Sequence, residues 1–201
     1  ATTSESFKGM DIAFISVSTD VSRELVPLAV QAGTVVIDDS SAFRMDPSVP
    51  LVVPEVNADD LEEHQGVISI PNCSTTPLVM ALNPLHKENP IKRVVVDTYQ
   101  SVSGTGVLAI EELNRQSQEV LDQKPAQSKV YPHQIAFNVL PHVEGFQING
   151  YTAEEMKMLN ETRKIMHAPA LNVSATCARV PVYLSHSEAV HVEFSESMEP
   201  E

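Results

Sequence analysis

The stretch DIAFISVSTDVSRELVPLAVQAGTVVI (residues 11–37) decides the fold class. Residues 11–17 form a short apolar run, residues 22–32 carry leucine and alanine at helical spacing, and residues 34–37 are apolar and β-branched. Gly33 ends the helical pattern, because glycine readily terminates a helix. A strand, a helix and a strand joined this closely indicate a right-handed parallel crossover, and therefore an α/β protein.

Further apolar runs extend this sheet and then begin another one. Residues 51–53 and 66–70 are β-prone, and helical spacing follows over residues 75–85. Beyond them the sequence predicts strands over residues 93–99, 172–182 and 189–194, helices over residues 108–121 and 152–166, and a polar, turn-rich segment over residues 124–133. The last two strands alternate in polarity, which favours a sheet with one exposed face and antiparallel pairing.

Composition excludes several classes of function. The chain has 201 residues, of which 42% are hydrophobic, and carries 27 acidic against 13 basic residues for a formal charge of −14. This charge repels nucleic acid and anionic membrane surfaces, so neither is expected as a partner. No stretch approaches the ~20 apolar residues of a membrane span, and ATTSESFKGMD at the start lacks the features of a signal peptide, so we expect a cytoplasmic protein.

Two cysteines stand far apart and show no spacing typical of a zinc site, so no metal is expected. Cys177 lies in the alternating stretch NVSATCARV, where a small buried side chain packs well. Cys73 lies in PNCSTTP, between an apolar run and a helix that Ser74 or Thr75 could cap. A helix N-terminus lowers the pKa of a thiol and favours the nucleophilic thiolate. From spacing alone, catalysis and structural packing remain equally open for Cys73.

Several blocks, in order along the chain, change that balance. They are SSAFRMD with VPLVVPEVN (residues 40–57), PNCST (71–75), TYQSVSGTG (98–106), GYTAEEMKM with ETRKIM (150–166), and SATCARVPV followed by HSEAV (174–190). In these blocks the chain resembles the aspartate-β-semialdehyde dehydrogenase family. That resemblance covers nearly the whole sequence, and separated blocks in the right order are far more specific than a lone glycine motif.

The resemblance implies an NADP-dependent enzyme that interconverts aspartate β-semialdehyde plus phosphate and aspartyl-4-phosphate, in the pathway to lysine, threonine, methionine and diaminopimelate. Cys73 matches the nucleophile that forms a thioacyl intermediate, and His186 matches the acid/base. Histidine suits this role because its ordinary pKa lies near neutrality. Standing alone, HSEAV would more simply be read as a surface histidine at a strand end.

The same likeness assigns the substrate contacts. Arg179 matches the arginine whose planar fork binds the substrate carboxylate. Glu154 matches the residue that holds the substrate ammonium, although Glu155 beside it leaves the register open. Gln100 matches the glutamine that positions substrate beside the cysteine.

Phosphate and cofactor contacts complete the implied site. Arg44, Asn72 and Lys157 match the phosphate-binding set, and Lys157 lies one helical turn from Glu154. Ser103 and Gly104 match cofactor contacts in the SVSGTG loop. Each of these residues, taken without the family, would be read as an ordinary polar or turn residue.

The implied architecture is an incomplete Rossmann-type dinucleotide-binding domain (residues 1–71) followed by an α+β catalytic and dimerisation domain (residues 72–201) with a mixed or largely antiparallel sheet. The family's GxxGxxG turn, which cradles the cofactor pyrophosphate, does not occur in this sequence. We therefore expect a piece of a longer gene product, poorly soluble and inactive alone. SVSTD stands where relatives carry a cofactor loop, and Ser185 stands where glycine is frequent.

Two alternative functions remain. An N-acetyl-glutamyl-phosphate reductase would share the fold plan and the Cys/His pair, but it would not need Glu154, because its substrate amine is acylated. A non-catalytic paralogue acting by association would not need Cys73, Gln100, Arg179 and His186 together. By resemblance we expect a homodimer that binds a small-molecule substrate and inorganic phosphate.

Overall fold

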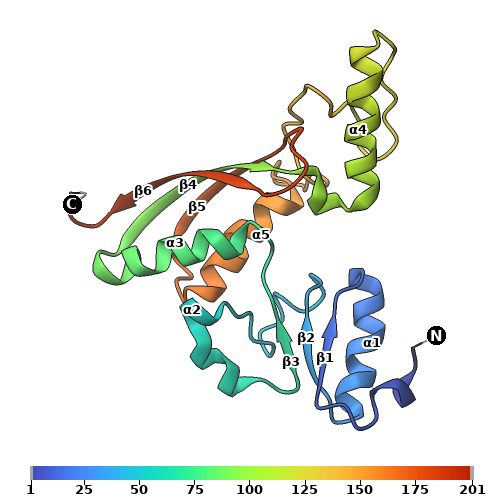
Figure 1. The fold of residues 1–201 in the computed structure, drawn as a ribbon. Coiled ribbons are helices and arrows are strands. Elements are labelled where there is room, and N and C mark those ends of the chain that lie inside the picture. Colours follow the sequence, from blue (N-terminus) through green and yellow to red (C-terminus); the bar gives the residue numbers. More distant parts are fainter. Residues whose placement is uncertain (1, 200–201) are drawn as a thin grey trace. The chain divides into compact units, whose positions relative to one another are not determined.

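The computed structural model describes residues 2–199. This part of the chain divides into two compact units (Figure 1). The first unit contains the residues up to 90 together with 160–171, and the second contains 91–159 together with those from 172 onward. The sequence placed a domain boundary after residue 71, whereas helix α3 (Thr75–Glu88) groups with the first unit. Helix α5 (Ala153–Ile165) contributes its first half to the second unit and its second half to the first unit.

The first unit is built on a parallel sheet of strand order β1-β2-β3. Besides the second half of α5, its elements are η1 (Ser4–Phe7), β1 (Ile12–Ile15), α1 (Thr19–Gln31), β2 (Val35–Asp38), α2 (Pro54–Asn57), η2 (Ala58–Glu63), β3 (Val67–Ser69) and α3. Helix α1 crosses from β1 to β2 beside the sheet (Figure 1) and buries Val26 and Ala29 against Ile15 and Val36. The predicted parallel crossover is therefore confirmed, and the α/β class with it.

Strand β1 leaves part of this sheet uncovered. Its side chains alternate between faces, as in any strand. Ile15 is buried under α1, whereas Ile12 and Phe14 point the other way and are 56% and 79% exposed. As an edge strand, β1 thus presents apolar surface to its surroundings.

The strand predicted over residues 51–53 is wrong. Leu51 makes only an isolated parallel bridge to Ser69, and α2 begins at Pro54. Proline has no backbone N–H for a ladder and its fixed φ suits the first turn of a helix, so the apolar run ends before a strand can form.

The second unit is built on a mixed sheet of order β5-β4-β6. Strand β4 (Ile91–Gln100) lies between β5 (Asn172–Arg179), which runs parallel to it, and β6 (Ser187–Phe194), which runs antiparallel (Figure 1). The predicted mixed sheet is confirmed. The antiparallel pairing expected of the last two strands is confirmed for β6 and is wrong for β5, which runs parallel to β4.

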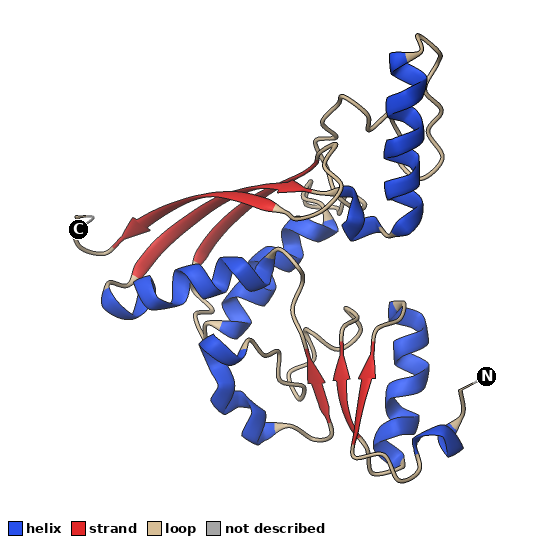
Figure 2. Cartoon of the chain, viewed as in Figure 1, coloured by secondary structure: helices blue, strands red, loops and turns tan. Residues whose placement is uncertain are grey.

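A helix and a long loop complete the second unit. After β4 come η3 (Val102–Thr105) and α4 (Val107–Leu121), and the chain to α5 is mainly loop (Figure 2), as its polar composition predicts. Buried side chains fasten this loop: Gln116 Oε1 accepts from the backbone N–H of Ile135 (2.8 Å), which packs beside Leu113. In the described residues, no helix is long and apolar enough to cross a membrane.

Candidate functional site

Cys73 lies in the turn between β3 and α3, and its side chain is exposed. The preceding residue, Asn72, holds this turn. Its Oδ1 accepts from the backbone N–H groups of Ser74 (2.8 Å) and Thr75 (3.4 Å), and its carbonyl accepts from the N–H of Thr76 (3.1 Å). The cap expected from Ser74 or Thr75 is thus supplied by Asn72. Asn72 fixes the backbone amides at the start of α3, directly after Cys73, and a helix N-terminus favours a thiolate.

Asn72 is linked to Arg44 through Glu161 of α5. Glu161 Oε1 accepts from Arg44 Nη1 at 3.2 Å, and its Oε2 accepts from the backbone N–H of Asn72 at 2.7 Å. All three side chains are buried. Arg44 Nη2 donates to the carbonyl of Asp39 (2.8 Å), whereas its buried Nε–H has no partner among residues 2–199. That N–H is a donor that an oxyanion could use.

Lys164, one turn beyond Glu161, holds the loop that carries Arg44. Its ammonium donates to the carbonyls of Arg44 (2.8 Å), Asp46 (2.7 Å) and Val49 (2.8 Å). Burial lowers the pKa of Lys164, while the nearby carboxylates of Asp46 and Asp60 oppose that shift. The ammonium serves as a fixed anchor, because its three donors meet three carbonyls.

Gln100, Glu154 and Lys157 form a polar cluster in the second unit. Gln100, the last residue of β4, donates through Nε2 to Glu154 Oε1 at 3.0 Å. Lys157 Nζ lies 3.2 Å from Glu154 Oε2 and also pairs with Glu144. Burial alone would lower the pKa of Lys157, but the two carboxylates outweigh it and raise that pKa above its usual range. Glu154 and Gln100 are almost fully buried, so the hydrogen bond between them is shielded from water.

Glu155, the alternative to Glu154, is engaged elsewhere. Its carboxylate accepts from the backbone N–H of Thr152 (2.7 Å), and its own N–H donates to Thr152 Oγ1 (3.3 Å). This reciprocal pair is a capping box at the start of α5. Glu155 also accepts from the N–H of Cys177 (3.2 Å), which makes it a structural residue.

His186 and Arg179 converge on the segment that follows β4. Arg179 Nη1 donates to the carbonyl of Ser101 (2.7 Å), and the backbone N–H of Ser101 lies 3.1 Å from His186 Nδ1. Because a backbone N–H only donates, Nδ1 accepts and the neutral ring carries its proton on Nε2. Burial, and then the charge of Arg179, lower the pKa of His186, while Glu154 and the backbone of Ser185 act in the opposite direction.

Glycine at position 104 is needed for this packing. A Cβ there would lie 3.2 Å from Arg179 Nη1 and 3.3 Å from His186 Cε1 and Nε2, closer than ordinary contacts. Ser103 Oγ lies 3.0 Å from Ser101 Oγ, and its backbone N–H donates to the carbonyl of Tyr183. The loop thus presents backbone directly beside His186.

Ser185 explains a departure seen in the sequence. Its φ of +70° lies in the left-handed region, where glycine is favoured. The glycine expected at this position would suit this conformation, and serine is a small residue that occupies it with some strain.

Cys177 is a packing residue, as its sequence context predicts. It is fully buried beside Met158 Sδ (3.6 Å). Burial raises its pKa to about 12, so the thiol stays protonated near neutral pH. In the part of the chain that the structure describes, no cluster of histidine, cysteine and acidic residues could hold a metal ion.

The predicted residues therefore lie in two groups. Cys73, Asn72 and Arg44 belong to the first unit, whereas the second unit holds Gln100, Ser103, Gly104, Glu154, Lys157, Arg179 and His186. Glu161 and Lys164 were missed. They share one side of a helix with positions 154 and 157, but that spacing does not show which groups their side chains bind.

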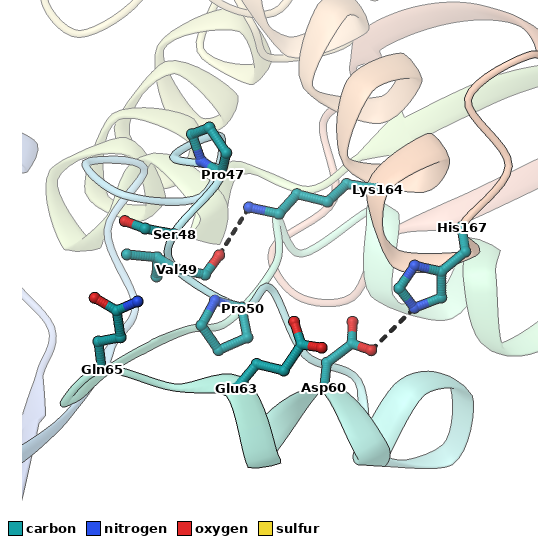
Figure 3. A pocket seen from close by; sticks show the side chains of 9 residues that line it. All are labelled: Pro47, Ser48, Val49, Pro50, Asp60, Glu63, Gln65, Lys164 and His167. Carbon is teal, nitrogen blue, oxygen red and sulfur yellow. Dashed lines mark hydrogen bonds and ion pairs between the residues drawn. The ribbon is translucent and has the colours of Figure 1, made fainter.

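A separate hollow of about 550 Å³ opens in the first unit. None of the predicted site residues is among its lining residues, which are Pro47, Ser48, Val49, Pro50, Asp60, Glu63, Gln65, Lys164 and His167. Figure 3 shows Lys164 reaching the carbonyl of Val49, and His167 Nε2 paired with Asp60 Oδ1 at 3.0 Å. The interactions drawn there link the lining residues to one another.

Two family models match the chain. "Semialdehyde dehydrogenase, NAD binding domain" matches residues 1–64, and "Semialdehyde dehydrogenase, dimerisation domain" matches residues 82–201. The boundary predicted after residue 71 falls between these ranges. Aspartate-semialdehyde dehydrogenase of Bacillus subtilis is 51% identical over 196 residues, which cover 94% of this chain. The chain spans 57% of that relative's length.

Comparison with solved structures finds the same family. Aspartate semialdehyde dehydrogenase II complexed with ASA, from Vibrio cholerae, is 46% identical and superposes with a TM-score of 0.91 over 93% of this chain and 56% of that one. Aspartate semialdehyde dehydrogenase with NADP, from Candida albicans, is 26% identical, with a TM-score of 0.70 over 94% of this chain and 52% of that one. The resemblance inferred from the sequence blocks is confirmed.

Proposed function

Because this chain belongs to the semialdehyde dehydrogenase family, we propose that its gene product interconverts aspartate β-semialdehyde plus phosphate and aspartyl-4-phosphate with NADP. The observation that carries the proposal is an exposed thiol, Cys73, on a turn whose amides Asn72 fixes, in a chain 51% identical to an aspartate-semialdehyde dehydrogenase. The family relation supports an oxidoreductase, and the steps of its reaction are proposed from the residues of this chain.

Cys73 is the proposed nucleophile. Its thiolate attacks the aldehyde carbon, a C–S bond forms, and the carbonyl oxygen gains a negative charge. As hydride then leaves that carbon, the C=O bond re-forms and a thioester remains on Cys73. When bound, NADP supplies the acceptor for this hydride. A phosphate oxygen next attacks the thioester, the C–S bond breaks, and the thiolate is released with the acyl phosphate.

His186 is the proposed acid/base. With Nδ1 accepting from Ser101, Nε2–H can donate to the carbonyl oxygen while that oxygen is charged, and the proton returns to Nε2 when the carbonyl re-forms. The low pKa of the ring favours this neutral form. Gly104 lets other groups approach Nε2 closely, which fits a contact of Ser103 and Gly104 with the nicotinamide.

The substrate's charged groups have partners in the second unit. We assign its carboxylate to the guanidinium of Arg179 and its ammonium to Glu154, since Glu155 is used in a capping box. Gln100, hydrogen-bonded to Glu154, would orient the substrate. A reductase for an N-acylated substrate would gain nothing from a buried carboxylate here.

Phosphate is assigned to Arg44, Asn72 and Lys157. The buried Nε–H of Arg44 is the supporting observation, because it is a charged donor without a partner in the described residues. Asn72 adjoins the nucleophile, and Lys157 keeps its positive charge through the neighbouring carboxylates.

We also propose a homodimer formed through the second unit. The family model that matches residues 82–201 is named a dimerisation domain. Within these residues, Phe137, Phe146 and Ile148 are large apolar side chains that are strongly exposed, as interface residues often are in an isolated protomer.

The test is turnover by the full-length gene product. We expect phosphate-dependent NADPH formation from aspartate semialdehyde, and its loss in Cys73→Ala. Preference for N-acetylglutamate semialdehyde would overturn the substrate assignment. Absence of turnover with either aldehyde, in a folded protein, would overturn the enzymatic proposal itself.

A further inference from the structure

Glu161 occupies an unusual place for a carboxylate. It is 1% exposed and lies in the second half of α5, within the first unit. A buried charge is costly unless it is paired and hydrogen-bonded. Here Oε1 accepts from Arg44 Nη1 (3.2 Å) and Oε2 from the backbone N–H of Asn72 (2.7 Å), so each oxygen has a donor.

The contact with Asn72 bears on the nucleophile. Asn72 is tied on one side to Glu161 through its N–H, and on the other side to the start of α3 through Oδ1 and its carbonyl. Cys73 lies between these two attachments. The orientation of its thiol therefore depends on a residue far away in sequence.

The contact with Arg44 bears on the phosphate group. Glu161 fixes one end of the guanidinium, the carbonyl of Asp39 fixes the other, and Lys164 holds the Arg44 backbone. A planar fork held at both nitrogens can present its Nε–H in one direction only. One turn of α5 thus sets the position of this guanidinium.

We propose that Glu161 is a positioning residue, which uses one carboxylate to align the Cys73 turn with the Arg44 guanidinium for phosphate attack on the thioester. This inference rests on the function proposed above. Glu161 acts through its hydrogen bonds with Asn72 and Arg44.

A carboxylate is required because both partners donate. In Glu161→Gln the amide keeps one acceptor, and its NH₂ faces a donor, so one of the two bonds must break. Glu161→Asp keeps both acceptors and the charge, on a side chain shorter by one methylene. Glu62→Gln is the matched control, because Glu62 is an exposed acid in η2 of the same unit.

The experiment measures kcat, the KM of each substrate and the melting temperature in the full-length gene product. For Glu161→Gln we expect kcat to fall about 100-fold, as for a nucleophile displaced by about 1 Å. The KM of aspartate semialdehyde should stay within about threefold, since its proposed ligands are untouched. Glu161→Asp should recover about tenfold of the loss in kcat, and Glu62→Gln should match wild type.

Two results would overturn the inference. One is a kcat, corrected for the folded fraction, within about threefold of wild type in Glu161→Gln. The other is a loss shared equally by Glu161→Asp and Glu161→Gln when both melt as wild type does.

A failure of the proposed function can be distinguished from a failure of the positioning role of Glu161. If wild type shows no turnover, alkylation of Cys73 by iodoacetamide near pH 7 decides the positioning role without any substrate. We then expect reaction about fivefold slower in Glu161→Gln than in Glu62→Gln, because the thiol is no longer held at the start of α3. Equal rates would overturn the inference.

Discussion

Replacing Gly104 by alanine puts a methyl group against the two side chains that converge beside the segment after β4. The new Cβ would lie 3.2 Å from Arg179 Nη1 and 3.3 Å from His186 Nε2. Carbon contacts are most favourable at about 3.5–4.0 Å, so the ring or the guanidinium must retreat by about 0.5 Å. Because a misplacement of about 1 Å costs about 100-fold, half of it should cost about tenfold, or about 1.4 kcal/mol in the activation barrier.

The assay is kcat and the KM for NADP and aspartate semialdehyde in the full-length gene product. Gly145→Ala is the matched control, since its Cβ would meet nothing within 4 Å and Gly145 belongs to the same unit. We expect kcat to fall in Gly104→Ala and to stay unchanged in Gly145→Ala. If kcat is unchanged in Gly104→Ala, or if the substitution changes only the KM for NADP, displacement of His186 does not limit turnover and its proposed role as acid/base is contradicted.

Three further predictions concern protonation and backbone strain. Burial, followed by the charge of Arg179, lowers the pKa of His186 below 6.5. The contribution of His186 to stability is therefore present above pH 6.5 and is lost as the pH falls through the folded pKa. The acid limb of the pH profile of kcat/KM should also lie below 6.5, and a limb above 6.5 would contradict the assignment of His186 as acid/base. Ser185→Val should lower the free energy of unfolding, measured by urea denaturation, by about 1–2 kcal/mol, because a β-branched residue is strained at φ +70°. Ser187→Val, on the neighbouring strand β6, should not lower it, and equal effects of the two substitutions would contradict the strain at Ser185. Cys177 should resist thiol reagents in the folded protein and react only in denaturant, and rapid native labelling would contradict its burial.

Apolar spacing was enough to find most of the elements. The helix predicted over residues 75–85 is the core of α3, and the strand over 93–99 is the core of β4. Apolar spacing predicted a strand wrongly over residues 51–53, because the prolines on either side of this run prevent a strand from forming. The pairing of strands could not be predicted from local sequence either. The alternation of polar and apolar residues in β6 shows which face is exposed, but it does not show which strand lies beside β6.

The site could be predicted only where a residue's identity reflects its chemistry. Cys73 is visible in sequence because a thiol before a helix is a recognisable arrangement. Glu161 is not, since an acid within a charged helix reads as solvent-exposed until Arg44 and the Asn72 amide are seen around it. Long-range pairs of this kind depend on tertiary packing, which the periodicity of α5 alone does not encode.

The proposed mechanism requires that Cys73 carries the acyl group, and this can be measured directly. The full-length gene product is mixed with aspartate semialdehyde and NADP without phosphate, quenched in acid, and examined by intact-protein and peptide mass spectrometry. We expect one acyl group on Cys73, formed together with one equivalent of NADPH and removed by added phosphate. NADPH formation with Cys73 unmodified, or an acyl group on another residue, would contradict the proposed mechanism.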